Sequence, residues 1–299
     1  MDRRRALLVD AFTTEPLSGN VAGVVPDADG LDAEQMRAIA AELGASETAF
    51  VCSSPSADRR IRYFTPTEEI DLCGHATIAA HAHLAAERAL EPGSHTLETN
   101  VGTLDIEVGE LGEIWMSQDA ATVRPLDVEY DRVADLLGVD VAALRDVGAD
   151  LPIALASTGL PFVLVPVNFL EHLSSVSPDL DAIDEFTTEH EAAGIYAFTF
   201  DTLDGDSTLH ARCFAPGVGI PEDPATGTAS GACGAYLRQM GAFDSMPDEL
   251  RFEQGHFVDR PSLVRVKVDK RIQVGGRAVT SLDGTLTISE FEDDDIIEA

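Results

Sequence analysis

Two glycine-led segments of this chain have residue types that could bind an anion. Residues 74–77 and 227–230 each begin with glycine and open a run rich in small side chains. We expect helices over 74–89 and 227–240, whose first N–H groups have no acceptor within the helix and lie at the positive end of its dipole. Two such helix starts could bind one carboxylate-bearing molecule between them. Small residues equally permit close helix packing, and the spacing alone does not decide between these interpretations.

The four cysteines give no sign of a disulfide framework or a zinc site. Cys52, Cys73, Cys213 and Cys233 lack CxxC spacing, and the apolar run near the start of the chain is too short for a secretory signal. The cysteines and histidines together do not show the ligand spacing of a zinc site. We therefore expect free thiols, no metal and a cytoplasmic protein.

An internal repeat indicates which elements position the glycine-led segments. Residues 61–66 and 211–216 share the pattern Arg-x-Phe-x-Pro, residues 73–77 and 226–230 follow them, and residues 102–104 and 284–286 are both Gly-Thr-Leu. Three echoes in the same order predict two similar halves, each with strands that lead into a central helix. Alternating apolar and polar residues at 104–108 and 263–268 predict half-buried strands. We divide the chain into residues 1–118 and 119–299, with a last strand that could cross back to the first half.

Length and charge limit the possible functions. The chain has 299 residues, enough for two domains, and its 53 acidic and 20 basic side chains give a net charge of −33. A surface this negative repels nucleic-acid phosphates and anionic membranes, and no apolar stretch approaches the ~20 residues of a membrane span. Molar salt screens such self-repulsion, so the charge predicts a halophilic protein. The acid-rich end, residues 291–299, is expected to be solvated.

Five segments, taken in order, resemble the PhzF family of phenazine-biosynthesis-type isomerases. They are residues 9–20, 46–50, 72–77, 222–229, and 254–255 with 260–262. No single segment is specific, but the combination covers nearly the whole chain. The resemblance implies an α+β fold like that of diaminopimelate epimerase, with two pseudo-symmetric domains, each a barrel-like β-sheet wrapped around a central α-helix. It also implies a homodimer.

The resemblance further implies which residues form the site. In the family, the glutamate of the Ser-Glu-Thr segment moves a proton on and off carbon without metal or organic cofactor, and here that residue is Glu47. A carboxyl group can do this when desolvation raises its pKa. His75 and Asp223 correspond to the polar partners that orient the substrate and shuttle or stabilise protons. The substrate-binding positions are Asn20, Gly74, Gly227 and Thr228. On residue type alone, Glu47 would be an exposed acid at a helix end and Asn20 a turn residue.

The cysteine positions separate two sister activities. Diaminopimelate epimerase resembles this chain in architecture but uses two cysteines, one on each face of a carbon. Cys73 matches the first position, whereas Thr226 stands at the second and cannot act as a thiol base. Two-thiol racemisation is therefore excluded, and we expect Cys73 to have a packing role. The phenazine enzymes usually carry serine where Thr228 stands, so its extra methyl group narrows the pocket.

The leading hypothesis is a cofactor-independent isomerase of a small carboxylate metabolite, in which Glu47 moves a proton from one carbon to another. One alternative is an epimerase or racemase in which Glu47 pairs with another acid; its product has an inverted centre instead of a shifted double bond. The other is a non-catalytic metabolite-binding protein. The presence of Glu47, His75 and Asp223 together argues against that alternative, because binding a carboxylate needs only the helix starts.

Overall fold

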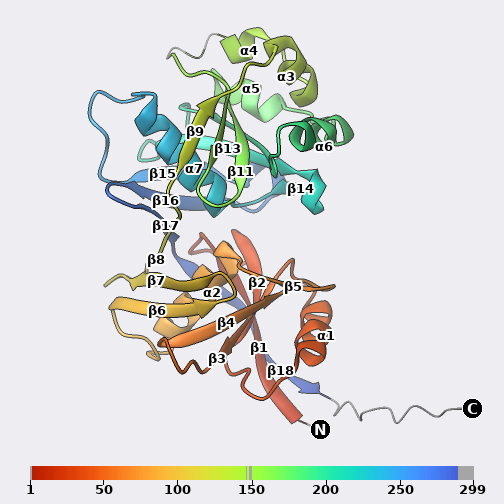
Figure 1. The fold of residues 1–299 in the computed structure, drawn as a ribbon, viewed down its shortest axis with the longest axis vertical. Helices are drawn as coiled ribbons and strands as arrows, with labels where there is room; N and C mark the ends of the chain where they lie inside the picture. Colours follow the sequence, from red (N-terminus) through yellow and green to blue (C-terminus); the bar gives the residue numbers. More distant parts are fainter. Residues whose placement is uncertain (1, 146, 148–149, 289–299) are drawn as a thin grey trace, which may run out of the picture.

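The computed structural model describes residues 2–145, 147 and 150–288, which form two lobes, each built around one helix (Figure 1). The central helices are α2 (Gly74–Ala86) and α7 (Gly227–Gln239). Both predicted helices are thus confirmed, although α2 ends three residues earlier than expected. It ends because Arg88 adopts a positive φ of 58°, a conformation that does not continue a right-handed helix. The acid-rich end, residues 291–299, lies outside the described residues.

The central helices are buried on all sides, which explains why the strands wrap around them. Nine residues of α2 and nine of α7 are buried, and most of their side chains are small. A helix that is apolar or small around its whole circumference requires cover on every face. The alanine- and glycine-rich sequences of these two helices therefore dictate a surrounding sheet in each lobe.

The lobe around α2 contains the first eight strands, the last strand and one outer helix. The outer helix is α1 (Ala33–Leu43), which begins with a capping box at Asp32 and ends at Gly44 in the left-handed conformation. The strands are β1 (Asp2–Ala11), β2 (Asn20–Val25), β3 (Thr48–Cys52), β4 (Arg59–Phe64), β5 (Glu69–Ile70), β6 (Gly93–Thr99), β7 (Gly102–Val108), β8 (Ile114–Ser117) and β18 (Ala278–Ile288). The last strand, β18, pairs antiparallel with β1 along the full length of β1.

The lobe around α7 contains the other nine strands and an outer layer of short helices. The helices are α3 (Tyr130–Leu137), α4 (Ala142–Arg145), α5 (Leu170–Ser175) and α6 (Leu180–Glu189). The strands are β9 (Thr122–Pro125), β10 (Ala154–Ser157), β11 (Pro161–Pro166), β12 (Gly194–Thr199), β13 (Leu209–Ala215), β14 (Ile220–Asp223), β15 (Leu250–Gln254), β16 (Ser262–Val268) and β17 (Ile272–Gly276). The outer helices bury a second apolar cluster against β11, β12 and β13.

Strand pairing repeats between the two lobes. In the first lobe, β2 and β3 are parallel, β3 and β4 antiparallel, and β4 and β6 parallel. In the second, the same sequence recurs as β11 with β12, β12 with β13, and β13 with β15. The internal repeat of the sequence thus corresponds to a structural repeat. The division at residues 118 and 119 stays a prediction; near it, β8 of the first lobe pairs with β17 of the second.

The Arg-x-Phe-x-Pro pattern performs the same task in both lobes. Arg62 forms a bidentate ion pair with Glu69 at 2.8 and 2.7 Å, and Arg212 forms one with Glu222 at 2.8 Å for both bonds. Each guanidinium also lies over the ring of the phenylalanine two residues later, about 5 Å from its centre. Each pair joins the arginine's strand to the short strand before the loop that leads into the central helix.

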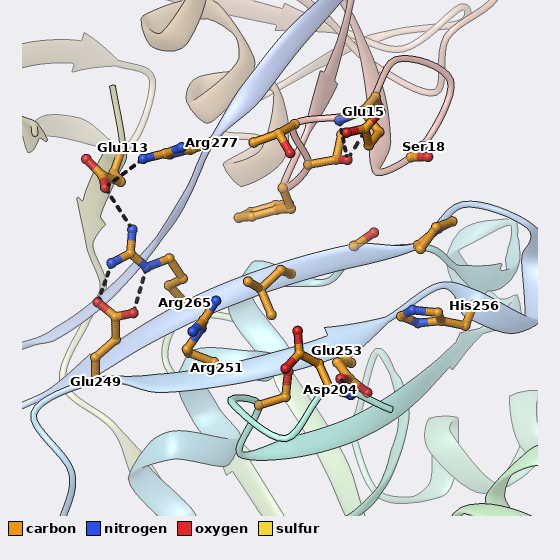
Figure 2. Close-up of a pocket in the computed structure, with 17 residues that line it drawn as sticks. Glu15, Ser18, Glu113, Asp204, Glu249, Arg251, Glu253, His256, Arg265 and Arg277 are labelled. Atoms are coloured by element: carbon orange, nitrogen blue, oxygen red, sulfur yellow. Dashed lines mark hydrogen bonds and ion pairs between the residues drawn. The ribbon is translucent and has the colours of Figure 1, made fainter. Parts of the chain in front are cut away.

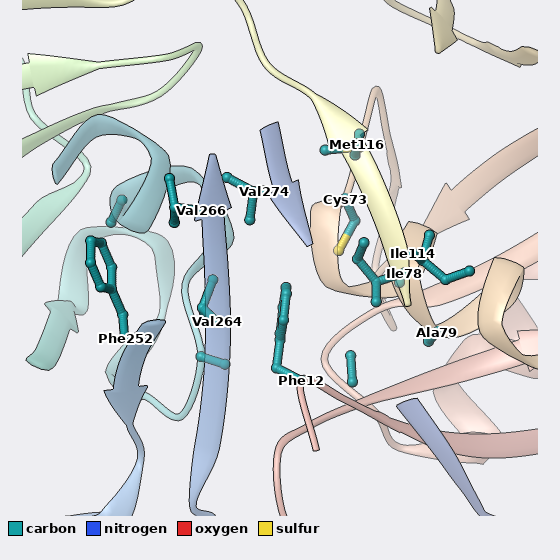
Figure 3. Packing of buried hydrophobic residues seen from close by; sticks show 14 of the residues in the cluster. Phe12, Cys73, Ile78, Ala79, Ile114, Met116, Phe252, Val264, Val266 and Val274 are labelled. Carbon is teal, nitrogen blue, oxygen red and sulfur yellow. The ribbon is translucent and has the colours of Figure 1, made fainter. Parts of the chain in front are cut away.

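One apolar core runs between the lobes. Phe12, which follows β1, lies between Cys73 on the side of α2 and Val264 and Val274 on the side of α7 (Figure 3). These residues are buried and belong to one cluster, so the lobes share packing as well as strand pairing. Within the described residues, none of the helices has both the length and the apolar character needed to cross a membrane.

Candidate active site

Glu47 lies in the short segment between α1 and β3. Its backbone carbonyl accepts a hydrogen bond from the Gly23 N–H at 2.9 Å, which attaches this segment to β2. A side chain at Gly23 would place its Cβ 2.3 Å from Thr48 Oγ1, so β2 can approach this closely only with glycine. The local backbone around Glu47 is therefore fixed by contacts with β2, and Glu47 is not an acid at the end of a helix.

The Glu47 side chain faces His75, the second residue of α2. The distance from Glu47 Oε2 to His75 Nε2 is 3.4 Å, and the two side chains are 16% and 12% exposed. In the described residues, Glu47 Oε2 is buried and has no hydrogen-bond partner. A carboxylate oxygen in this state retains an unused lone pair in a partly dry environment, as a proton acceptor requires.

Cys73 completes this group from the other side of the imidazole. Its Sγ lies 3.3 Å from His75 Nδ1, and the residue is buried at the N-cap of α2. Burial, helped by the nearby charge of Glu47, raises the pKa of the Cys73 thiol well above its ordinary value. The backbone N–H groups of His75 and Ala76, at the start of α2, lower the pKa of this thiol by less than burial raises it. Cys73 is therefore held as a protonated thiol near neutral pH.

Asp223 is held by groups from both lobes. Asn20 Nδ2, at the start of β2, donates to Asp223 Oδ1 at 2.8 Å, and Thr226 Oγ1 donates to Oδ2 at 2.5 Å. Burial raises the pKa of Asp223 to about 6; the Thr226 hydrogen bond and nearby His75 act to lower the pKa, whereas Glu47 acts to raise it. Asp223 thus lies within electrostatic range of both His75 and Glu47, and it titrates close to neutral pH.

Gln254, at the end of β15, holds the loop that carries Asp223, and sequence reasoning gave it no role. Its fully buried side chain donates from Nε2 to the Asp223 carbonyl at 2.7 Å and to Thr226 Oγ1 at 3.0 Å. Its Oε1 accepts from the Thr226 N–H at 3.1 Å. Gln254 lies in one of the five segments that carry the family resemblance, but an amide does not titrate, so its residue type indicated no chemistry.

The two helix starts belong to the same site, because the charge of Asp223, three residues before Thr226 at the start of α7, acts on the Cys73 thiol at the start of α2. The central helices α2 and α7 contact one another. Neither N-cap residue, Cys73 or Thr226, caps its helix with a side-chain hydrogen bond. In α7 the Thr226 hydroxyl is turned toward Asp223 instead. The N–H groups at these starts are thus not occupied by the usual side-chain caps.

The glycines at the two starts differ in how much space surrounds them. A Cβ on Gly74 would lie 3.7 Å from Met116, an ordinary contact, whereas a Cβ on Gly227 would lie 3.2 Å from Val274 and 3.5 Å from Phe12. Close packing therefore accounts for glycine at position 227 but not at position 74. Thr228 follows in the first turn of α7, half-buried, and its carbonyl accepts a hydrogen bond from Thr158 at 3.2 Å.

Three donor atoms of different kinds come together in this site, although the sequence spacing predicted no metal ligands. Glu47, Cys73 and His75 each offer one atom, and the three atoms lie within 4.8 Å of one another. The spacing could not reveal this group because Glu47 belongs to a separate segment and reaches α2 only through the fold. All four cysteines of the chain are free, as predicted.

A separate groove of about 600 Å³ lies between the loop after β1 and strands β15 and β16 (Figure 2). None of the predicted site residues lines it. Glu113 pairs with Arg277 at 3.4 Å and with Arg265 at 3.2 Å, and Arg265 also pairs with Glu249 at 2.7 Å. Arg265 and Arg277 are thus already paired with acidic side chains. Three other residues that line the groove, Glu15, Asp204 and Glu253, are also acidic. The groove is distinct from the candidate site.

Known proteins resemble this chain over nearly its whole length. Residues 9–284 match the model of the phenazine biosynthesis-like protein family, PhzC-PhzF. The uncharacterized isomerase YfhB of Bacillus subtilis is 35% identical over 295 residues, which cover 97% of this chain and 98% of the relative. The trans-2,3-dihydro-3-hydroxyanthranilate isomerase of Pseudomonas chlororaphis is 30% identical over 298 residues, which cover 94% and 99% of the two chains.

A solved structure gives the same result for the fold. The crystal structure of a PhzF-family phenazine biosynthesis protein from Bacillus anthracis matches with a TM-score of 0.87 and 37% identity, over 96% of this chain and 100% of that chain. The predicted resemblance and the predicted α+β fold of the diaminopimelate epimerase type are confirmed.

Proposed function

Because this chain belongs to the phenazine biosynthesis-like protein family, we propose that it moves a proton between two carbons of a small carboxylate-bearing metabolite, with Glu47 as acid and base. Its relatives are named isomerases, and because this chain belongs to the same family it is an isomerase as well. The substrate class, the route of the proton and the independence from cofactors are the proposed part.

The observation that carries the proposal is the state of the Glu47 carboxylate. Its Oε2 atom is buried, has no hydrogen-bond partner in the described residues and lies 3.4 Å from His75 Nε2, beyond the normal range of an N–H···O bond. The protein therefore holds the carboxylate in position but, within the residues that the structure describes, leaves its Oε2 atom without a hydrogen bond. A base in this condition is free to accept a proton from a bound carbon acid.

The reaction needs two proton transfers and no other reactant. In the first, the Glu47 carboxylate takes a proton from one carbon, and the electron pair left behind spreads over the adjoining unsaturated system. In the second, the protonated Glu47 returns the proton to a different carbon, so a double bond shifts and the molecular formula is unchanged. His75 and Asp223 hydrogen-bond polar substituents of the substrate during both steps.

The substrate carboxylate binds at the helix starts. The N–H groups of Gly74, Gly227 and Thr228 lie in the first turns of α2 and α7, which contact each other, so one carboxylate can be held between them. This local positive potential offsets the repulsion that a net charge of −33 exerts on an anion. The first-turn methyl group of Thr228 limits the size of the group that enters beside it.

The test is proton NMR in deuterated high-salt buffer. Wild type, Glu47→Gln and the control Glu42→Gln are incubated with unsaturated, hydroxy- and amino-carboxylates, among them trans-2,3-dihydro-3-hydroxyanthranilate. Glu42 is an exposed acid on α1, five positions before Glu47. We expect deuterium to enter one substrate carbon with wild type and Glu42→Gln, and the rate to fall at least about 100-fold with Glu47→Gln. Exchange that survives Glu47→Gln at full rate would place the base elsewhere.

Epimerisation is the second candidate because Asp223 is a further acid in the same site. It comes from the other lobe, and its pKa of about 6 allows it to donate or accept a proton near neutral pH. An epimerase needs two such groups on opposite faces of one carbon. Deuterium at a centre whose configuration has inverted, with no shifted double bond, would favour this candidate. Failure of the whole panel to exchange would favour a metabolite-binding protein.

A further inference from the structure

Arg260 lies outside the candidate site, yet its side chain binds the opposite lobe. It stands just before β16, in the second lobe. Its Nη2 atom donates to the Ser18 carbonyl at 2.7 Å and to Asp10 Oδ1 at 2.8 Å, and its Nε atom donates to the Gly19 carbonyl at 2.7 Å. Asp10 belongs to β1 and is buried. One guanidinium group therefore joins the second lobe to the loop between β1 and β2.

The first end of this loop is attached by backbone hydrogen bonds. The Phe12 carbonyl accepts from the Leu263 N–H at 2.8 Å, and the Thr13 N–H donates to the Arg277 carbonyl at 3.2 Å. Because these bonds join backbone groups, they do not depend on the identity of any one side chain. A substitution elsewhere should therefore leave this end of the loop in place.

The second end of the loop depends on side chains. Leu17 adopts a positive φ of 68°, which residues other than glycine rarely do, so this turn needs support from outside. The Leu17 N–H donates to Asp10 Oδ2 at 2.7 Å, and the other oxygen of Asp10 accepts from Arg260. Arg260 thus supports the end of the loop that leads directly into Asn20.

The backbone of Arg260 is held against the loop after β14, the strand that ends in Asp223. The Ser262 hydroxyl lies 2.8 Å from the Pro224 carbonyl oxygen and 3.0 Å from that of Arg260. A Cβ on Gly255 would lie 2.6 and 2.3 Å from the same two oxygen atoms, so glycine at this position lets the two segments lie side by side. The position of Arg260 relative to Asp223 is therefore fixed.

Arg260 connects the two partners of one hydrogen bond. Its backbone lies beside the residue after Asp223, and its side chain holds the carbonyl of the residue before Asn20. The Gly19 N–H, which donates to the Pro261 carbonyl at 3.1 Å, adds a further bond between the same segments. We propose that Arg260 is a positioning residue, which sets the geometry of the Asn20–Asp223 hydrogen bond without touching the substrate. Its effect on the reaction rests on the proposed function, whereas its effect on Asn20 does not.

The proposal depends on the shape of the guanidinium group and not only on its charge. Arginine presents its N–H donors in a rigid planar fork, whereas the lysine ammonium is one compact charge on a flexible chain. In Arg260→Lys the ammonium can pair with Asp10, so the buried carboxylate keeps a partner. It cannot reproduce the three bond directions of the guanidinium group. Asn20 should then be held less firmly in a protein that still folds.

The first experiment needs no substrate and measures solvent exchange of the Asn20 side-chain amide by NMR, on isotope-labelled protein in high-salt buffer. The amide donates to Asp223 Oδ1 and to the Ala225 carbonyl, and Asn20→Ala identifies its signals by their absence. We expect Arg260→Lys to speed this exchange at least about 10-fold, and Arg271→Lys to leave it unchanged. Arg271 is a suitable control because its side chain is 70% exposed and forms a surface ion pair.

The second experiment is a double-mutant cycle on the rate of substrate deuteration. If Arg260 acts through Asn20, Arg260→Lys should lower kcat about 10-fold in wild type but less than about 2-fold when Asn20→Ala is already present. The KM should change less than about 2-fold, because the helix starts that bind the substrate carboxylate are not altered. Effects that multiply in the double variant would show that Arg260 acts by another route, and would overturn the proposal.

The two proposals fail separately. Circular dichroism establishes that each variant is folded, and Arg260→Gln serves if the lysine variant is not. Unchanged exchange of the Asn20 amide in a folded Arg260 variant would overturn the positioning role. If Arg260 controls the amide but wild type deuterates no compound, the proposed function is wrong and the control of Asn20 by Arg260 stands. If deuteration depends on Glu47 but not on Arg260, the proposed function stands and Arg260 has no part in the reaction.

Discussion

The Nδ2 atom of Asn20 donates a hydrogen bond to Oδ1 of Asp223 at 2.8 Å, across 203 positions of the sequence. The same amide donates to the Ala225 carbonyl at 3.0 Å. Asn20 begins a strand of the first lobe, and Asp223 ends a strand of the second. One buried amide therefore fixes the position of a carboxyl group from the other lobe, and it makes the candidate site a product of both halves.

Substitution Asn20→Ala should weaken both the site and the fold. It removes two hydrogen bonds, one to the part-buried Asp223 carboxylate and one to the buried Ala225 carbonyl, which we expect to lower the free energy of unfolding by about 1–3 kcal/mol. Asp223 then loses a fixed orientation, so the rate of substrate deuteration should fall about 10-fold or more. The control is Asn100→Ala, since the Asn100 amide makes an exposed bond to Glu69. Equal effects of the two substitutions would contradict the assigned role of Asn20.

The raised pKa of Asp223 predicts a specific dependence of stability on pH. The folded-state pKa of about 6 lies above the ordinary value of 3.8, so the folded protein binds this proton more tightly than the unfolded chain does. The resulting stabilisation is fully present below pH 3.8 and is lost as the pH rises through 6. Its size is on the order of 3 kcal/mol.

The measurement compares unfolding of wild type and Asp223→Asn in high salt from pH 4 to pH 8. Because the amide does not titrate, wild type should lose stability relative to the variant as the pH rises, with the change centred between pH 4 and 6. The contributions of the other carboxylates to the pH dependence of stability are the same in both proteins, as long as the two have the same fold, so they cancel in this difference. A difference that is flat across this range, or that has the opposite slope, would show that Asp223 is not held in a desolvated state.

The ion pair between Arg212 and Glu222 should contribute far more to stability than an exposed pair. Arg212 is buried, pairs with Glu222 through two bonds and donates to the carbonyls of Leu173 and Val176. Its replacement by methionine leaves a poorly solvated carboxylate without a partner, and we expect a loss of about 3–5 kcal/mol.

The matched control for this pair is Arg132→Met. Arg132 pairs with Glu189 at 2.6 Å, but the two side chains are 46% and 54% exposed, so the loss should stay below about 1 kcal/mol. Denaturant unfolding in high salt measures both variants. Arg212→Met should also slow deuteration, since Glu222 directly precedes Asp223 in β14. Losses of similar size in the two variants would contradict the prediction.

The charge of −33 predicts that the protein requires salt. The Debye length falls from about 10 Å at 0.1 M to about 3 Å at 1 M, and repulsion among the acidic side chains falls with it. We expect the thermal midpoint to rise steeply with potassium chloride, and to rise much less with sucrose, which is excluded from the protein surface without screening charge. Full circular-dichroism structure and an unchanged midpoint at 0.1 M would contradict a halophilic protein.

The helices, the strands and their repetition could be predicted from the amino-acid sequence. Small residues over 74–86 and 227–239 could form only helices that require cover on all sides, and the Arg-x-Phe-x-Pro pattern marked the same hairpin in each lobe. Both signals can be seen in the sequence, because residue types recur with the period of a helix or a strand and the same motif recurs in each half of the chain. The order of the five family segments therefore indicated the fold correctly.

The contacts between the site residues, and the degree to which each is buried, depend on the folded chain. Glu47 reaches His75 and Cys73 because Gly23 lets β2 lie against Thr48, and Asp223 reaches Asn20 because the two lobes pack against Phe12. The raised pKa values of Cys73 and Asp223 likewise come from burial by distant segments. Strand register and desolvation depend on contacts between residues far apart in sequence, so no local pattern encodes the donor cluster or the fixed carboxyl group.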